Sequence, residues 1–329
     1  MKLRTQTEIS QAEFSIGYDT PVMFLGSCFA GEIGRQFSRG KMNVMVNPFG
    51  VLYNPYSTAR ALETIMEGKE FREEDLFYFN NRYLSFRHDT GFSSVDSSVS
   101  LSRINHSISS SESFLKRASV IFITFGTAWV YRFNENNEIV ANCHKIPASK
   151  FTRQLLEIDD IVDYWERLLR KLKKYNPGLK IVFTVSPVRH LKDGAHGNQV
   201  SKSILLLAIE RLREGDTDLS YFPSYEIVLD DLRDYRYYKK DMIHPSETAI
   251  EYIWEIFKKV YFKPETISIY KRLIKITESV GHRITGDDIQ SVKDFSSTML
   301  SKINELKNDF PLIDLGQEED YFRKMVSDE

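Results

Sequence analysis

The chain has 329 residues, of which 42% are hydrophobic and 27% are charged, a balance typical of a soluble globular protein with a buried core. Its 44 basic and 46 acidic residues give a formal net charge of −2, so no overall field attracts nucleic acid or anionic lipid. No run approaches the roughly 20 apolar residues that a membrane helix needs, and the N-terminus does not have the pattern of a secretory signal. We therefore expect a cytoplasmic protein with no nucleic-acid partner and no membrane association.

Five short apolar runs are rich in β-branched or aromatic residues, and segments with helical periodicity separate them. The runs are PVMFLG (21–26), NVMVN (43–47), SVIFITFG (119–126), KIVFTVSP (180–187) and YEIVLD (225–230). Strands that alternate with helices favour a mostly parallel sheet with helices on both faces. The pattern predicts a doubly wound α/β fold with a five-stranded sheet.

Other segments of the chain indicate the elements around this sheet. Residues 93–113 are rich in serine and predict a loop that leads into a polar-faced helix. The polar stretch NENNE separates two alternating runs within 129–141, which predicts a hairpin at the carboxyl edge of the sheet. Residues 159–175 carry apolar positions at helical spacing, namely Ile161, Val162, Trp165, Leu168, Leu169 and Leu172.

The strand signal stops after a predicted helix at 247–262. Two further helices, 267–279 and 288–308, and an acidic tail make up the rest of the chain, with an apolar stripe at Ile267, Tyr270, Leu273, Ile274 and Ile276. We therefore predict an α/β domain at 1–262 and a helical extension at 263–329. Packing of this extension on the sheet domain or on a second copy, as a homo-oligomer, is left open.

Ser27 follows the first predicted strand and precedes a helix. Ligands bind at the carboxyl ends of strands in such sheets, and amides at a helix N-terminus can stabilise an oxyanion there. A serine at this position is also a common helix cap, so both roles stay open at this point.

Asp241 and His244 lie three residues apart, just before the helix at 247–262. This spacing can bring the carboxylate onto imidazole Nδ1, which would leave Nε2 as a general base. The alternative is a turn aspartate followed by a polar surface histidine.

These features occur in a fixed order: Gly-Ser after the first strand, Asn-Pro-Phe-Gly (47–50) after the second, Phe-Gly-Thr (125–127) after the third, and Asp-x-x-His near the end. This order resembles the SGNH, or GDSL-like, hydrolase superfamily. The string Gly-Ser-Cys-Phe-Ala at 26–30 is similar to the signature of the GSCFA family, and 142–147 (NCHKIP) and 185–190 (VSPVRH) look like its later blocks. The resemblance covers about 21–262.

The resemblance implies a flavodoxin-like three-layer sandwich with Ser27 as the nucleophile, His244 as the base and Asp241 as the group that orients it. The oxyanion donors implied by the superfamily are the amides of Ser27 and Gly50 and an asparagine side chain in the third block. That asparagine is absent, because Gly126 is followed by Thr127 and Ala128.

A missing donor costs on the order of 3 kcal/mol of transition-state stabilisation. Asn142 and His144 follow the predicted hairpin, so either side chain can supply a substitute, unless they belong to an exposed loop. Gly126 is a further candidate contact.

Other chemistry has little support in the sequence. The seven histidines are scattered and there is no paired cysteine spacing, so we expect no metal. No glycine-rich phosphate loop follows a strand, so we expect no cofactor. Cys28 is expected to pack against the sheet. Tyr53, Tyr56 and Trp129 are either core residues or platforms for a sugar ring.

The leading hypothesis is an ester hydrolase or O-acyltransferase that acts through a Ser27 acyl-enzyme on an acylated carbohydrate or small ester. Two alternatives remain. One is a catalytically silent binding module, favoured by Ala128, and the other is an assembly protein that docks partners through the C-terminal helices.

Overall fold

The computed structural model describes residues 5–214, 216, 218–280 and 289–327. The chain forms two compact units. Unit 1 comprises 1–9, 21–34 and 44–254, and unit 2 comprises 10–20, 35–43 and 255–329. The predicted division of the chain into functional domains at residue 262 stays a prediction.

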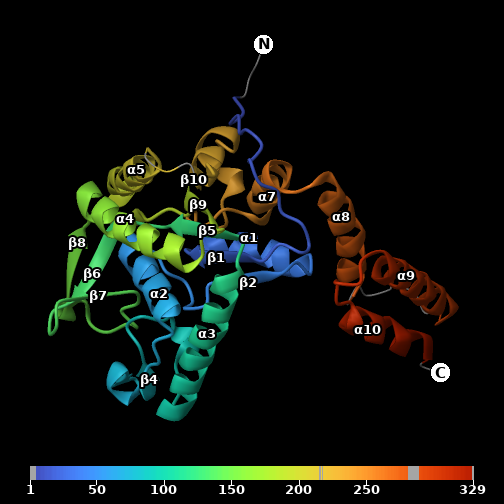
Figure 1. The fold of residues 1–329 in the computed structure, drawn as a ribbon, viewed down its shortest axis with the longest axis horizontal. Coiled ribbons are helices and arrows are strands. Elements are labelled where there is room, and N and C mark those ends of the chain that lie inside the picture. Colours follow the sequence, from blue (N-terminus) through green and yellow to red (C-terminus); the bar gives the residue numbers. More distant parts are fainter. Residues whose placement is uncertain (1–4, 215, 217, 281–288, 328–329) are drawn as a thin grey trace. The chain divides into compact units, whose positions relative to one another are not determined.

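Unit 1 is built on a five-stranded sheet in the order β10-β9-β5-β1-β2, and every neighbouring pair is parallel (Figure 1). The strands are β1 (Val22–Gly26), β2 (Val44–Val46), β5 (Val120–Phe125), β9 (Lys180–Val185) and β10 (Leu219–Tyr221). Numbered along the sheet's own strands, this is the 2-1-3-4-5 order of flavodoxin-like folds. The predicted α/β class is confirmed.

The alternation of side chains along each strand supplies two apolar faces. Met23 of β1 and its register partner Ile121 of β5 belong to one core cluster. Phe24 and Phe122, the next pair along, stack at 4.9 Å between ring centroids on the opposite face. A sheet that is apolar on both faces requires a helical layer on each side.

Four helices cover the face that carries Met23: α2 (Pro55–Glu67), α3 (Ser97–Arg117), α4 (Ile158–Tyr175) and α5 (Gly194–Arg213). Helix α2 lies between α3 and α4 (Figure 1). The first residues of α1 (Cys28–Arg39) cover the other face, where a Cβ on Gly34 would fall 2.5 Å from Val46 Cγ2 of β2. The helix predicted at 159–175 is confirmed, and all six of its predicted apolar positions are buried.

A three-stranded antiparallel sheet, in the order β7-β6-β8, follows the carboxyl end of β5. Its strands are β6 (Trp129–Phe133), β7 (Glu138–Val140) and β8 (Phe151–Leu155), which confirms the predicted hairpin and adds a third strand. A short hairpin of β3 (Phe77–Phe79) and β4 (Arg82–Leu84) precedes α3. The helical part of the serine-rich segment, 97–113, belongs to α3, where Ile104 and Ile108 are buried.

The strand predicted at 225–230 is wrong. That segment is helical, as α6 (Ser224–Glu226) and a π-helical stretch (Ile227–Asp231), and the fifth strand is β10. Ile227 and Val228 are buried, and a short apolar run fits a buried helix as well as a buried strand. Only three residues form β10, and they give no apolar run in the sequence.

Helix α7 (Glu247–Tyr261) begins in unit 1 and ends in unit 2. Unit 2 continues with α8 (Pro264–Ser279), α9 (Ile289–Asp309) and α10 (Gly316–Ser327), which confirms the helical extension. Leu273 and Ile276 belong to the core of this unit, whereas Ile267 and Ile274 of the predicted stripe are only half-buried. The first residue of the predicted helix at 288–308 lies outside the described residues. No helix in the described ranges is long and apolar enough to span a membrane.

We expect Gly26→Ala to lower the free energy of unfolding by about 3 kcal/mol or more, because a steric conflict at a strained backbone cannot relax. Gly26 has φ +132°, and a Cβ there would lie 2.2 Å from the carbonyl oxygen of Thr124. Gly31→Ala is the matched control: its Cβ would meet nothing closer than 3.6 Å, and alanine should stabilise the helix by about 0.5–1 kcal/mol. Urea denaturation of both variants measures the difference, and equal stability of the two would contradict this account of Gly26.

Candidate active site

Ser27 lies at the end of β1, beside β5, which is the switch point of a sheet with this strand order. Its amide donates to the Thr124 carbonyl at 3.2 Å, so the ladder between β1 and β5 extends to Ser27. The side chain is 1% exposed, and Oγ has no hydrogen-bond partner in the described part of the chain. Ser27 Oγ therefore does not cap α1, and a buried hydroxyl without a partner in the protein is left available to a ligand or to water.

Asp241 and His244 form a hydrogen-bonded pair. Asp241 Oδ2 lies 2.7 Å from His244 Nδ1, while Oδ1 accepts the amides of Ile243 (2.9 Å) and His244 (3.0 Å). The two backbone amides and the imidazole lower the pKa of Asp241 to about 2. The carboxylate thus closes a turn and orients the ring in one arrangement, which leaves imidazole Nε2 as the free nitrogen.

His244 lines a cavity of about 520 Å³, here called the active-site cavity. Cys28, Tyr53 and Thr127 line it as well. Ser27 adjoins this lining, because it precedes Cys28 in the chain and a Cβ on Gly126, the residue before Thr127, would be 3.4 Å from Ser27 Cβ. Ser27 is not itself a lining residue, and within the described chain no hydrogen bond joins its hydroxyl to His244.

The main-chain groups expected at the oxyanion position all make bonds within the protein. The amide of Gly50 donates to the Asn47 carbonyl at 2.8 Å, and that of Gly126 to the Tyr53 carbonyl at 2.8 Å. The Ser27 amide is engaged with Thr124, as described above. Ala128 is fully buried and does not line the cavity.

Of the two substitutes predicted for the missing asparagine, the structure places one at the cavity. Asn142 lines it, and its Oδ1 accepts the His144 amide at 2.8 Å. The His144 ring is buried, with Nε2 2.8 Å from the Ser85 carbonyl oxygen, and burial lowers its pKa. His144 is not among the cavity-lining residues.

Three residues near Ser27 are not indicated by the sequence. Asn54 caps α2 through Oδ1, which accepts the Ser57 amide at 2.8 Å, and it lines the cavity. His190 also lines the cavity, and burial lowers its pKa to about 4. Asn54 follows the Asn-Pro-Phe-Gly loop at 47–50, and His190 is the last residue of the VSPVRH block at 185–190. Neither pattern indicates the direction of the side chain.

Lys202 of α5 is the third of these residues. Its side chain is fully buried, and Nζ donates to the Gly126 carbonyl (2.6 Å) and the Ser186 carbonyl (2.7 Å). Burial lowers its pKa to about 7. A lysine within an otherwise ordinary helical segment carries no signal of burial, so this residue could not be found from the sequence.

The walls of the active-site cavity are aromatic and cationic. The Arg153 guanidinium lies 3.9 Å from the Trp129 ring centroid and pairs with Asp193, and Lys192 donates to the Tyr131 hydroxyl at 2.8 Å. No carboxylate lines this cavity among the described residues. A carbonyl oxygen that gains negative charge would therefore find a favourable field.

Two expectations about single residues change. Cys28 is half-buried and lines the cavity rather than packing wholly against the sheet, and burial raises the pKa of its thiol. A raised pKa leaves the thiol protonated at neutral pH, so Cys28 is a poor nucleophile. Of the predicted platforms, Tyr53 and Trp129 line the cavity, whereas Tyr56 packs on Tyr164 at 4.6 Å. In the described residues, no cluster of three or more His, Cys, Asp or Glu could hold a metal ion.

The fold and this site define a doubly wound α/β protein with a serine at the switch point and an Asp-His pair at the adjoining cavity. Residues 21–257 match the sequence profile of the GSCFA family, and the chain belongs to that family. No protein of curated function matches the chain in sequence.

Similar solved structures include a family 3 carbohydrate esterase from Talaromyces cellulolyticus (10% identity, TM-score 0.35, covering 77% of this chain and 98% of that one). An acetyl xylan esterase from Butyrivibrio proteoclasticus is another (12% identity, TM-score 0.39, covering 74% and 63%). Likenesses this distant do not bear on what this chain acts on.

We expect Lys202→Met to change how stability depends on pH. A pKa of about 7 in the folded chain, against about 10.4 unfolded, means that the unfolded chain binds more protons between these values. The free energy of unfolding of the native chain should therefore rise with pH between these two values. This rise should be steeper than the rise in Lys202→Met by up to about 1.4 kcal/mol per pH unit. Urea denaturation at several pH values measures the free energy of unfolding, and Lys174→Met, at an exposed lysine, is the control. The prediction is wrong if the free energy of unfolding depends on pH in the same way in the native chain and in Lys202→Met.

Proposed function

We propose that this protein is a serine ester hydrolase in which Ser27 is the nucleophile, His244 the general base and Asp241 the group that orients His244. The observation that carries the proposal is the Asp241–His244 pair at a cavity that adjoins a buried serine hydroxyl without a partner. A buried hydroxyl at a switch point is poised for chemistry on a bound ligand.

The proposed reaction has two half-reactions. His244 Nε2 accepts the Ser27 hydroxyl proton as Oγ attacks the ester carbonyl, and the tetrahedral intermediate collapses when His244 returns that proton to the departing alcohol oxygen. Water then attacks the acyl-Ser27 carbonyl, gives a proton to His244, and the carboxylic acid leaves as Oγ regains the proton. Asp241 stays ionised throughout, because its pKa of about 2 keeps it a carboxylate at neutral pH.

The hydrogen bond between Ser27 Oγ and His244 Nε2 is expected to form when the substrate binds. Catalytic hydrogen bonds are often long or poorly aligned without substrate and tighten in the complex. The His244 side chain is 42% exposed, so water can reach its imidazole and be activated there for the second half-reaction. Access to water favours hydrolysis over transfer to a second hydroxyl, which would make the protein an O-acyltransferase.

Asn54 is the proposed side-chain donor to the oxyanion. Its Oδ1 is fixed by the Ser57 amide at the start of α2, which leaves Nδ2 as the free end of a side chain that lines the cavity. Asn142 is the alternative donor from the sequence; its Oδ1 is likewise fixed, by the His144 amide. An acylated carbohydrate or small ester fits the aromatic walls of Tyr53 and Trp129.

The first test is chemical labelling and turnover. A fluorophosphonate probe should label the native chain, and Ser27→Ala should lose the label and lower kcat on p-nitrophenyl acetate by at least about a thousandfold. His244→Ala should have a similar effect, and Ser102→Ala on the exposed side of α3 serves as the control. A native chain that neither takes the label nor turns over any ester would instead support a catalytically silent binding module.

The second test separates the two oxyanion donors. Asn54→Ser keeps a residue that caps helices and removes the amide, so it should lower kcat about a hundredfold with little change in thermal stability. The Asn142→Ala/His144→Ala double variant should then keep native kcat. The reverse result, loss in the double variant and none in Asn54→Ser, would assign the donor to Asn142 and reject Asn54.

A further inference from the structure

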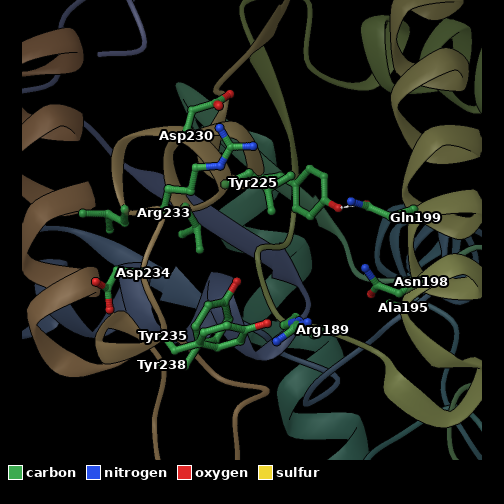
Figure 2. A pocket seen from close by; sticks show the side chains of 13 residues that line it. Arg189, Ala195, Asn198, Gln199, Tyr225, Asp230, Arg233, Asp234, Tyr235 and Tyr238 are labelled. Carbon is green, nitrogen blue, oxygen red and sulfur yellow. Dashed lines mark hydrogen bonds between the residues drawn. The ribbon is translucent and has the colours of Figure 1, made fainter. Parts of the chain in front are cut away.

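A second cavity, of about 410 Å³, lies within unit 1 beside α5 (Figure 2). We call it the tyrosine pocket and define it by Tyr235, Tyr238, Arg189, Asp230 and Asp234. Its volume is within the range of small-molecule sites. None of the proposed catalytic residues lines it.

One side of the tyrosine pocket is an aromatic surface. Figure 2 shows the rings of Tyr235 and Tyr238 together, with centroids 6.3 Å apart and a tilt of 44° between the planes. The Arg189 guanidinium lies 5.8 Å and 5.2 Å from their centroids. Tyr235 is 66% exposed although it is large and aromatic. A ring held in place at a cavity but left open to solvent is suited to contact with a ligand that has a flat apolar face.

The opposite side carries hydrogen-bonding groups of both kinds. Asp230 and Arg233 lie across from the tyrosine rings, and Asn198 and Gln199 reach in from α5 (Figure 2). Two carboxylates and two guanidinium groups, those of Asp230, Asp234, Arg189 and Arg233, balance in charge. Equal numbers of acidic and basic groups around an aromatic surface match a neutral polyhydroxylated ring and do not favour a phosphate.

Arg189 connects this pocket to the active-site cavity, because it lines both. Its amide donates to the Ile243 carbonyl at 3.1 Å and Nη1 donates to the Met242 carbonyl at 3.3 Å. Both carbonyls belong to the turn between Asp241 and His244. A ligand that spans the two cavities would therefore contact the residue that supports the proposed base.

We propose that the tyrosine pocket binds a neutral sugar unit next to the acylated unit, so that the substrate is an esterified oligosaccharide and not a small free ester. This inference rests on the proposed function for the chemistry at Ser27. One sugar ring stacks on Tyr235 and Tyr238, and its hydroxyls bond to the carboxylates and amides opposite. Contacts of this kind with a remote part of the substrate can be used to organise the reacting centre.

Binding is measured first, with no ester present. Ligand-observed NMR of the full chain with unacylated xylotetraose, cellotetraose and chitotetraose, each at about 10 mM, should show binding of at least one in the millimolar range. Tyr235→Ala should weaken that binding at least about tenfold, while Tyr237→Ala, a neighbouring tyrosine outside the pocket, should not. The inference is overturned if none of the three binds, if Tyr235→Ala leaves binding unchanged, or if inorganic phosphate alone binds in a Tyr235-dependent way.

Kinetics then separate this inference from the proposed function. With the acetylated form of the oligosaccharide that binds, Tyr235→Ala should raise KM about tenfold, and turnover of p-nitrophenyl acetate should stay native. If p-nitrophenyl acetate is turned over and no oligosaccharide binds, the tyrosine pocket proposal fails and the hydrolase proposal stands. If an oligosaccharide binds but no ester is cleaved, the hydrolase proposal fails together with the esterified substrate, and only the sugar site at the tyrosine pocket stands.

Discussion

The close approach of β1 to β5 at Gly26 is the constraint on which the site depends. Only a glycine fits there, and the amide of the next residue, Ser27, still bonds to the Thr124 carbonyl. The loop after β2 is fixed to the same point, because Asn47 Oδ1 accepts the Gly26 amide and the Leu52 amide donates to the Gly26 carbonyl. Three chain segments thus meet at one residue, and a serine placed directly after it has almost no freedom of position.

A second set of hydrogen bonds connects the strand ends beside Ser27 to the turn that holds His244. Lys202 bonds to the carbonyls that follow β5 and β9, at Gly126 and Ser186, and so holds two strand ends together. Three residues beyond Ser186, Arg189 bonds to the turn that precedes His244. A buried lysine with a lowered pKa is costly, and a cost of this kind is often found where a protein builds a functional site.

The protonation states around the cavity favour a single acid–base pair. Cys28 is held as a thiol, His190 as a neutral ring and Asp241 as a carboxylate, each through the pKa shift that its surroundings impose. Asp241 makes the hydrogen bond to Nδ1 that orients His244 at the cavity. Lys192 then biases the same space toward developing negative charge, while the charge of Arg153 is offset by its pair with Asp193.

Local patterns in the sequence determined the elements whose stability is local. The helix at 159–175 and the Asp-x-x-His turn depend on contacts within a few residues, which periodicity and spacing record. Tertiary structure alone decided the features that depend on distant partners. The run at 225–230 is helical although it resembles a strand, and the His144 ring bonds to the Ser85 carbonyl. Asn54 lines the active-site cavity, and Lys202 bonds to the Gly126 carbonyl. An apolar or polar residue type favours burial or exposure, but the direction of a side chain is set by segments that lie far away along the chain.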